Sequence, residues 1–548
     1  MSPQHFKKYK AYPSVDLPDR QWPNRRITQA PIWCSVDLRD GNQALSTPMN
    51  IEQKIVMFKL LVEIGFKEIE VGFPSAAQVE FDFIRTLIEK NLIPDDVTIQ
   101  VLTQAREHLI IRSMESLKGA KRAVMHMYNS TSPAQREVVF GKTKDEIKAI
   151  AVEGTRLIKS LAAQMSDTEI LYEYTPESFT ATELEYALEI SLAVIDTWQP
   201  TKDKPIIINL PSTVELSTPN IYADRIEWFA RHVKPREAVI ISVHTHNDRG
   251  CAVAAAELAV MGGAERVEGA LFGNGERSGN MDLLTMALNL YSQGVDCKLN
   301  LNNIPHIAEV YEQCTGMDIH QRHPWAGELV YTAFSGSHQD AIHKGLKHHA
   351  DHPREYWDVP YIPIEPSDIG RTYEGVIRIN SQSGKGGVSY ILEKEAGIQI
   401  PKWMQPDFGR VVQKISDSTG RELQPKEIHN AFDCTYLLNG NLLKKYQIVS
   451  GSSKTSLEAE VDMGGRQIAF KAEGNGPVDA FITGVAQAAG VHVAVTNYAE
   501  HALTKGADAQ AIAFVEVNAN GCVVYGAGCD ANISAASIKA VVSAINRL

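Results

Sequence analysis

The chain has 548 residues, which excludes a single small module at roughly 150 residues per domain. Hydrophobic residues make up 44% and charged residues 22%, which is close to the average for soluble globular proteins and excludes wholesale disorder. The net charge of −12 has the wrong sign for a protein that binds nucleic acid by neutralising phosphates.

The first 30 residues form an N-terminal arm, after which the pattern becomes that of an α/β protein. Residues 31 to about 294 alternate between short β-branched runs and segments with apolar residues at three- and four-residue spacing, which is typical of strand–helix units. The clearest helices are predicted at Ile51–Ile64, Lys144–Ala162, Thr182–Thr197 and Pro219–Val233. The eight predicted strands are Ile32–Asp37, Glu68–Phe73, Thr98–Thr103, Ala123–Tyr128, Glu169–Tyr174, Ile206–Leu210, Val239–His244 and Val267–Phe272.

Eight such units predict a closed (β/α)₈ TIM barrel over residues 31–325. A doubly wound open sheet is the alternative, but no dinucleotide-binding fingerprint supports it. Gly273-x-Gly275 lacks its third glycine, because Ser278 stands there. The segment Ser383–Gly387 resembles a phosphate-binding loop, but Ile379 replaces the loop's first glycine.

The alternation stops between residues 326 and 430, which are rich in histidine and proline and predict a connector with small helices. Residues 431–548 predict a C-terminal α+β domain. Within it, Glu460-Val461 followed by Gly465 recurs 56 residues later as Glu516-Val517 followed by Gly521, which suggests two similar halves. Its predicted elements are strands at Leu457–Val461, Gln467–Lys471, Val491–Val495, Ile512–Val517 and Val523–Tyr525, and helices at Val478–Ala489 and Ser534–Ile545.

The seven cysteines are odd in number and never spaced as a CxxC pair, so we expect reduced thiols. The longest uncharged stretch, Ala480–Ala499, contains Gln487, His492 and Asn497 and is a poor membrane span. The N-terminal lysines precede no apolar region. We therefore expect a cytoplasmic protein with no membrane partner.

The most specific motif is His244-Thr245-His246-Asn247-Asp248, at the end of the seventh predicted strand. Residues two apart on a strand point to the same side, so both imidazoles can reach one ion. Two hydrogen-bonded histidines would be the ordinary alternative. A second polar cluster, Arg39-Asp40-Gly41-Asn42-Gln43, follows the first strand and favours a site, because catalytic groups converge at the carboxyl ends of barrel strands.

A third cluster, Gly273–Asn280, follows the eighth strand, which adjoins both the first and the seventh in a closed barrel. Two imidazoles, one carboxylate and an amide oxygen suit a catalytic divalent metal, either Mg²⁺, Mn²⁺ or Zn²⁺. Arg39 would stabilise negative charge that develops on oxygen. Further polar residues are expected on the same rim: His126, Glu173, Glu177, Asn209 and Thr213. Any one of them alone would be explained by structural hydrogen bonding, but their grouping on one rim favours a functional site.

Leu38–Gln43, followed by Lys54, and the run from Ile241 through His244 to Gly250 resemble the two motifs of the isopropylmalate and homocitrate synthase family. The segments Leu210–Glu215 and Asn380–Gly387 and the C-terminal domain are similar to the long-form members of this family. Shorter relatives carry Glu at the position of Asn42. The resemblance covers essentially the whole chain.

The resemblance implies condensation of acetyl-CoA with 2-oxoisovalerate, followed by thioester hydrolysis, in leucine biosynthesis. It implies that Asp40, His244, His246 and Asn280 bind the metal. Arg39, helped by Glu177, would stabilise the alkoxide. His126 and Thr213 would contact the 2-oxo acid. Whether K⁺ activates the reaction is left open.

The base that deprotonates acetyl-CoA is left open between His338 and Tyr373, both in the connector. The resemblance implies that the connector reaches over the partner subunit's barrel, so that a homodimer completes the site. It also implies that leucine binds the C-terminal domain as a feedback inhibitor, and deletion beyond about residue 430 is expected to abolish this sensitivity. The expected effector contacts are Gly526, Gly528, Asp530 and Asn532.

Two other functions remain open. The motifs do not separate the 2-oxo acids, so a citramalate or homocitrate synthase is the first alternative. The second is a leucine sensor that keeps the barrel as a scaffold, which the intact set of Arg39, Asp40, His244 and His246 disfavours.

Overall fold

The fold is described from a computed structural model. The described residues are 8, 10–333, 335–353, 356–371, 385–419, 423–437, 442–450, 454–463, 465–490, 492–503, 509–519 and 521–548. The chain forms two compact units, one of Met1–Val330 with Pro366–Arg371 and the other of Tyr331–Glu365 with Thr372–Leu548. The division into arm, barrel, connector and C-terminal domain stays a prediction, and helix α13 (Pro425–Tyr436) runs across its boundary at residue 430.

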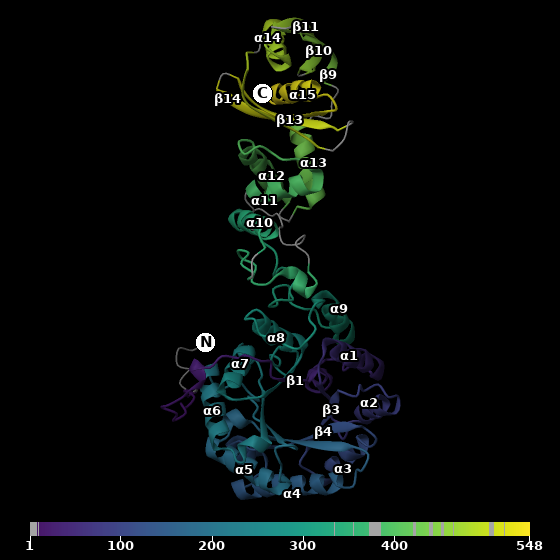
Figure 1. Cartoon of the computed structure of the whole chain (residues 1–548), viewed down its shortest axis with the longest axis vertical. Helices are drawn as coiled ribbons and strands as arrows, with labels where there is room; N and C mark the ends of the chain where they lie inside the picture. The colour runs from purple at the N-terminus through teal and green to yellow at the C-terminus, as the bar shows by residue number, and fades with distance from the viewer. Residues whose placement is uncertain are drawn as a thin grey trace. The chain divides into compact units, whose positions relative to one another are not determined.

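Eight parallel strands close into a barrel in chain order, with β8 paired back onto β1, so the predicted TIM barrel is confirmed (Figure 1). Strand β8 ends earlier than predicted because the chain turns into the 3₁₀ segment η7 (Leu271–Gly273), in which Phe272 has a left-handed φ of 55°. The strands are β1 (Ile32–Ser35), β2 (Glu68–Gly72), β3 (Thr98–Gln104), β4 (Arg122–Ser130), β5 (Glu169–Glu177), β6 (Ile206–Asn209), β7 (Val239–His244) and β8 (Arg266–Gly269).

Helices surround the strands of the barrel (Figure 1). Their ends follow local sequence signals. Asn50 and Gln53 form a capping box at the start of α1, and Gly65, with a φ of 107°, ends it. The helices of this unit are α1 (Ile51–Ile64), α2 (Gln78–Glu89), α3 (Glu107–Ser116), α4 (Lys144–Ala162), α5 (Leu184–Trp198), α6 (Pro219–His232), α7 (Ala252–Gly262), α8 (Leu283–Tyr291) and α9 (Ile304–Thr315).

The strand register brings three distant segments to one end of the barrel. Ser35 at the end of β1 pairs with Gly269 at the end of β8, and His244 at the end of β7 pairs with Glu268. Because all three strands are parallel, the loops that follow them leave the barrel at the same edge. The clusters after β1, β7 and β8 are therefore neighbours, as the sequence predicts.

The second unit has a helical part and a sheet part that share one apolar core. Phe408 and Phe432 pack edge to face, with ring centroids 5.5 Å apart, and Ile512 and Phe514 of β13 join the same buried cluster. The helices are α10 (Gly336–Asp351), α11 (Lys385–Ala396), α12 (Gln405–Thr419) and α13.

The C-terminal domain consists of two halves, each with three antiparallel strands and a helix. Both repeated sequences lie at equivalent hairpins, whose turns contain Gly465 and Gly521 with φ of 82° and 89°. The predicted internal repeat thus corresponds to a repeated fold. The halves are β9 (Leu443–Ser450), β10 (Thr455–Met463), β11 (Arg466–Gly474) and α14 (Pro477–Ala489), then β12 (Ala494–Ala502), β13 (Ala511–Ala519), β14 (Cys522–Asp530) and α15 (Ile533–Ile545).

Strand β9 has no counterpart among the predicted strands, and β12 continues past the predicted end at Val495. Both are edge strands of their sheets. Residues such as Thr496, Asn497 and Glu500 are exposed on β12. Polar residues on an exposed edge weaken the apolar alternation by which strands are recognised.

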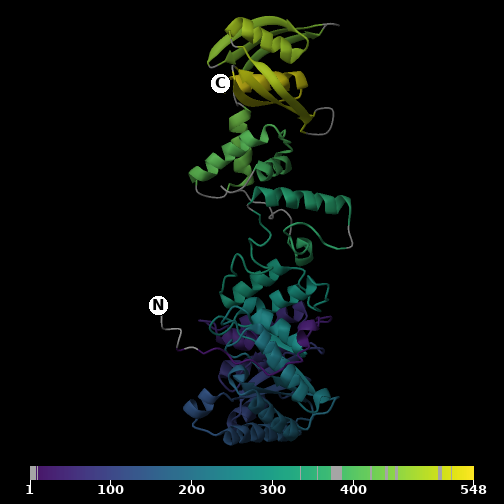
Figure 2. The same ribbon diagram turned by 90° about the vertical axis from the view of Figure 1, so that its left-hand side faces the viewer.

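Two glycines let α15 lie directly on β14. A Cβ atom at Gly526 would collide with the carbonyl oxygen of Ala540 and lie 2.5 Å from the amide nitrogen of Ala544. A Cβ atom at Gly528 would collide with the carbonyl oxygen of Ala536. Figure 2 shows α15 (yellow) against the strands of its own half. The close approach buries nearly the whole apolar helix.

Among the described residues, no helix has both the length and the apolarity that a membrane span requires. All seven cysteines are described and are free thiols, as expected.

We predict that Gly526→Ala lowers the free energy of unfolding by about 1–3 kcal/mol, because the new methyl group meets backbone atoms of α15 that cannot move independently. Scanning calorimetry would detect this as a drop of several degrees in Tm. The matched control is Gly476→Ala, where a Cβ atom meets nothing within 4 Å and a loss of less than about 1 kcal/mol is expected at this helix N-cap. Equal losses in the two variants would contradict this packing argument.

Candidate metal centre and active site

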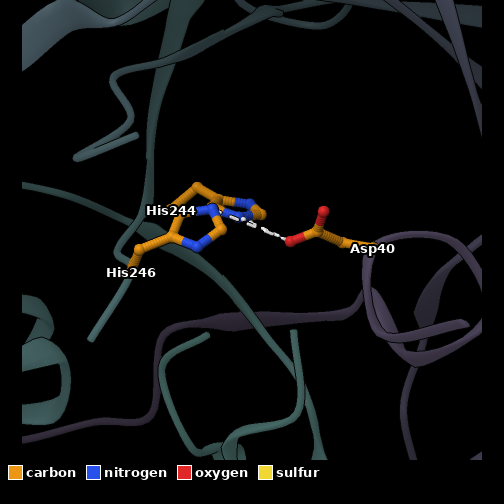
Figure 3. A group of neighbouring side chains, drawn as sticks. All are labelled: Asp40, His244 and His246. Carbon is orange, nitrogen blue, oxygen red and sulfur yellow. Dashed lines mark ion pairs between the residues drawn. The ribbon is translucent and has the colours of Figure 1, made fainter. Parts of the chain in front are cut away.

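Asp40, His244 and His246 converge at the carboxyl end of the barrel (Figure 3). The Oδ2 atom of Asp40 lies 3.5 Å from Nε2 of His244 and 3.7 Å from Nε2 of His246. All three residues are buried, and their potential ligand atoms lie within 4.8 Å of one another. Three side chains from two distant segments thus offer one oxygen and two nitrogens to a common point.

The loop that presents Asp40 is held by its own polar residues. After β1 the chain forms one turn of π-helix, Asp37–Gly41 (η3). The buried Asp37 carboxylate accepts a hydrogen bond from the Ser35 hydroxyl at 2.8 Å and another from the Leu271 amide at 3.0 Å. Burial raises the pKa of Asp37 to about 7, although these hydrogen bonds oppose it. Asp37 therefore ties the loop after β1 to the loop after β8.

The charges of the site are strongly coupled. Burial would raise the pKa of Asp40, but the Arg39 guanidinium at 2.9 Å and the two imidazoles outweigh it and hold that pKa well below its usual range. Burial lowers the pKa of His244, but Asp40 and Glu268 outweigh it and raise that pKa to about 9. Burial and the charge of His244 lower the pKa of His246 to about 3. Asp40 therefore stays ionised beside the two imidazoles.

Two buried oxygens of this site accept no hydrogen bond within the described part of the chain, Oδ2 of Asp40 and Oδ1 of Asn280. Asn280 is paired through its backbone with His246, and its amide nitrogen donates to the carbonyl of Asn274 at 2.8 Å. Buried oxygens without donors are costly unless another group occupies the space. A mixed set of oxygen and nitrogen donors with open lone pairs fits a divalent cation.

Beneath this site lies a network of charged residues inside the barrel. Glu268 accepts from Nδ1 of His244 at 2.8 Å and so orients the ring, leaving Nε2 directed toward Asp40. Arg39 donates to Glu70, which also contacts Nδ1 of His126 at 2.7 Å. The network thus fixes the orientation of the His244, Arg39 and His126 side chains.

Arg266 supplies the positive charge in the centre of this network. Its guanidinium, fully buried, lies 2.8 Å from Glu268 and 3.4 Å from Glu173, and it donates to Gln100 at 2.8 Å. Burial raises the pKa of Glu173 well above its usual range, and Arg266 offsets this only in part. Burial acts in the same direction on Glu268, but Arg266 and His244 outweigh it, and its pKa lies well below the usual range.

A second group of potential ligands, His126, Glu173 and Glu268, belongs to this network. Arg266 already contacts both carboxylates, and Nε2 of His126 is hydrogen-bonded to the Thr175 hydroxyl at 2.7 Å. A guanidinium in contact with both carboxylates occupies the place of a cation. The group therefore supports the site above it and is not a second metal centre.

A cavity of about 710 Å³ opens above the converging residues. It is large enough for a drug-sized ligand. Of the predicted residues, Arg39, Asp40, His126, Glu177, Asn209, Thr213, His244 and His246 line it. Its apolar wall includes Pro48, Phe73, Val79 and Leu102.

Glu177 and Thr213 are each fixed by one contact within the barrel. Glu177 accepts a hydrogen bond from the Ser130 hydroxyl. The Thr213 hydroxyl oxygen accepts from the Ser178 amide at 3.0 Å, which leaves its proton for another acceptor. Both side chains can therefore take part in binding at the cavity wall.

Of the two candidate bases, the structure describes only His338, which lies in the second unit. His338 is exposed on the first turns of α10, where its ring stacks on Tyr361 at 3.9 Å between centroids. Tyr373, with most of the Asn380–Gly387 motif, lies outside the described residues.

The four predicted effector residues each have a structural role. Gly526 and Gly528 allow the close contact of β14 with α15. Asp530 pairs with Lys539 at 2.6 Å, and the Asn532 side chain caps α15 by accepting from the amides of Ser534 and Ala535. Contact of these residues with leucine stays a prediction.

Four residues that orient the site from below were not predicted: Glu70, Gln100, Arg266 and Glu268. A signal was present, because Glu70, Gln100 and Glu268 interrupt the apolar runs of predicted barrel strands and Arg266 directly precedes one. Charged residues are rarely buried unless they are paired, and several inside one barrel would have indicated such a network.

Three segments of the chain match known families. Residues 30–310 match the family described as HMGL-like, and residues 328–393 match "Alpha-isopropylmalate synthase, post-catalytic domain-like". Residues 422–548 match "LeuA allosteric (dimerisation) domain".

Whole-length relatives agree with these matches. The 2-isopropylmalate synthase of Clostridium acetobutylicum is 52% identical over 99% of both chains. That of Rhodospirillum rubrum is 51% identical over 99% of this chain and 98% of its own, and that of Pseudomonas savastanoi pv. phaseolicola is 52% identical over 99% and 97%. By these matches over nearly its whole length, the chain belongs to the 2-isopropylmalate synthase family and is an acyltransferase of that kind.

Proposed function

We propose that this chain condenses acetyl-CoA with 2-oxoisovalerate and water to give 2-isopropylmalate and CoA, the first committed step of leucine biosynthesis. Family membership supports the reaction. The single structural observation that carries it is the convergence of Asp40, His244 and His246 on one point of a cavity wall that also contains Arg39. The proposal takes the reaction to be cytoplasmic, in keeping with the seven free thiols.

In this proposal Asp40, His244 and His246 hold a divalent cation, either Mg²⁺, Mn²⁺ or Zn²⁺, with Asn280 as a further ligand. The fit rests on the two buried oxygens without hydrogen bonds, on Asp40 and Asn280, and on the orienting contact of Glu268 with His244. When bound, such an ion polarises a carbonyl as a Lewis acid and orients the substrate.

The remaining polar side chains act on the substrates directly. Arg39, held by Glu70 and Asp40, presents a positive charge to oxygen on which negative charge develops, and Glu177 assists it. His126 and Thr213 hold the 2-oxo acid, since both line the cavity. Glu70 and Thr175 fix the His126 ring, and the Ser178 amide fixes the Thr213 hydroxyl. The isopropyl group of 2-oxoisovalerate suits the apolar wall near Leu102.

The proton acceptor for acetyl-CoA is assigned to the connector, to either His338 or Tyr373. In this proposal the connector of one subunit reaches the barrel of the other, so that the homodimer is the active form. The match of residues 422–548 to a dimerisation domain supports the homodimer.

The first prediction concerns the 2-oxo acid. We expect kcat/KM for 2-oxoisovalerate to exceed that for pyruvate by about 100-fold or more, because pyruvate lacks two methyl groups and each apolar carbon in a fitted pocket is worth about 1–3 kcal/mol. Release of CoA thiol, with a blank lacking 2-oxo acid, measures both rates in parallel with 2-oxoglutarate. A preference for pyruvate or 2-oxoglutarate would identify a citramalate or homocitrate synthase instead.

The second prediction concerns the metal. Asp40→Asn should lower divalent-metal affinity by on the order of 100-fold or more, since the loss of a mere supporting contact already costs about 10–100-fold. Calorimetric titration with Mn²⁺ measures this without reference to turnover. The matched control is Asp248→Asn, two residues past His246, where Arg277 already pairs with the carboxylate at 2.6 Å and metal affinity should stay within about threefold. Unchanged binding in Asp40→Asn would remove the centre of the proposal.

We also propose that leucine binds the C-terminal domain and inhibits the enzyme. The match to an allosteric domain supports this. Deletion beyond residue 430 would be a poor test, because it cuts α13 and exposes Phe408, which packs on Phe432 in the shared apolar core. A point variant that keeps the fold is needed.

Asn532→Asp provides that variant, because aspartate caps a helix as well as asparagine does. If the Asn532 amide contacts leucine, we expect the leucine concentration for half inhibition to rise by about tenfold with unchanged Tm. The matched control is Asn518→Asp at the opposite end of the same strand pair, where the side chain accepts from the Gly521 amide. If Asn532→Asp is half inhibited at the same leucine concentration as the parent, Asn532 does not contact leucine. If leucine does not inhibit the parent, the proposed regulation is wrong.

A further inference from the structure

One face of α10 is covered by the loop Trp357–Ile362, called here the covering loop. The helix residues that meet it are His338, Gly345 and His349, which recur at spacings of seven and four and so share one face. His349 meets the Trp357 ring edge-on at 4.9 Å. The loop and the helix therefore form one local structure within the second unit.

The covering loop is held at three points. The Trp357 indole donates to the carbonyl of Ile362 at 2.7 Å and so closes the loop on itself. Val359 and Ile362 are 6% and 3% exposed, which anchors the loop by burial. Gly345 permits the close approach, because a Cβ atom there would lie 2.6 Å from Cδ of Pro360 and 3.2 Å from Cγ1 of Val359.

This anchoring places Tyr361 on His338. Tyr361 has a φ of 64°, which a residue with a large side chain rarely adopts, and its ring is stacked on the imidazole with centroids 3.9 Å apart and planes 24° apart. Both side chains are exposed, and Tyr361 is 63% exposed. Burial of the Tyr361 side chain therefore does not account for its strained backbone, which accompanies the stack on His338.

We propose that Tyr361 is a positioning residue for His338, and that the covering loop exists to hold the two rings together. An exposed imidazole on a helix surface would otherwise sample several rotamers. A stacked aromatic ring restricts it to one orientation and leaves its edge nitrogens open for proton transfer. The inference deepens the proposed function and rests on it only for the role of His338 as the proton acceptor.

The tyrosine ring, and not its hydroxyl group, is what the proposal requires. Tyr361→Phe keeps the ring and should keep kcat within about twofold of the parent. Tyr361→Leu removes the ring but keeps a side chain that is not branched at Cβ, and should lower kcat by about tenfold while KM for 2-oxoisovalerate changes by less than about twofold. Tyr356→Leu, at an exposed tyrosine next to the loop, is the matched control and should behave as the parent does.

A spectroscopic measurement tests the stack without turnover. In the full-length protein with ¹³C-labelled histidine, the His338 ring signal is assigned as the one lost in His338→Ala. The aromatic ring current should displace it in the parent and in Tyr361→Phe, and the displacement should disappear in Tyr361→Leu. A signal that does not move in Tyr361→Leu would overturn the proposed stack.

The kinetic outcomes separate the inference from the proposed function. If His338→Ala is inactive but Tyr361→Leu turns over as fast as the parent, the positioning role is wrong and the function of His338 stands. If His338→Ala keeps full kcat, His338 is not the base, the assignment passes to Tyr373, and the positioning role of Tyr361 is wrong. The double variant Tyr361→Leu/His338→Ala should be no slower than His338→Ala alone, because Tyr361 acts through that ring.

Discussion

The parallel pairing of β8 with β1 is the constraint on which the rest of the site depends. It closes the barrel at Ser35 and Gly269, and it brings the turn that carries Asp40 beside the end of β7 that carries His244. Without that closure the two segments would lie at opposite edges of an open sheet. Asp37, which accepts from Leu271, ties the two loops together at the seam.

Closure alone does not give a site its chemistry, because the converging side chains must also point the right way. Here the interior of the barrel contains buried charged side chains at positions where most barrels have layers of aliphatic side chains. Arg266 makes this tolerable by contacting Glu173 and Glu268 at once, and Glu268 in turn orients His244. The polar interior therefore supports the site, and its charged side chains take the place of apolar ones.

The second unit follows a different principle, in which glycine permits contacts that side chains would prevent. Gly526 and Gly528 bring α15 onto β14, and Gly345 brings the covering loop onto α10. In each case the missing Cβ atom sets the distance between two elements, and neighbouring residues such as Tyr361 then acquire their partners. Small residues thus determine the geometry that larger residues use.

The sequence by itself determined the barrel, the internal repeat and the grouping of Asp40, His244 and His246, because strand–helix alternation and the HxH and RDG clusters are local patterns. It could not determine the edge strand β9, whose exposed polar residues carry no apolar alternation. Only the tertiary structure decided that Gly526 and Gly528 serve helix packing, and that Arg266 and Glu268 support His244. Those roles depend on which atoms come into contact in the folded protein, and the spacing of residues along the chain does not give these contacts.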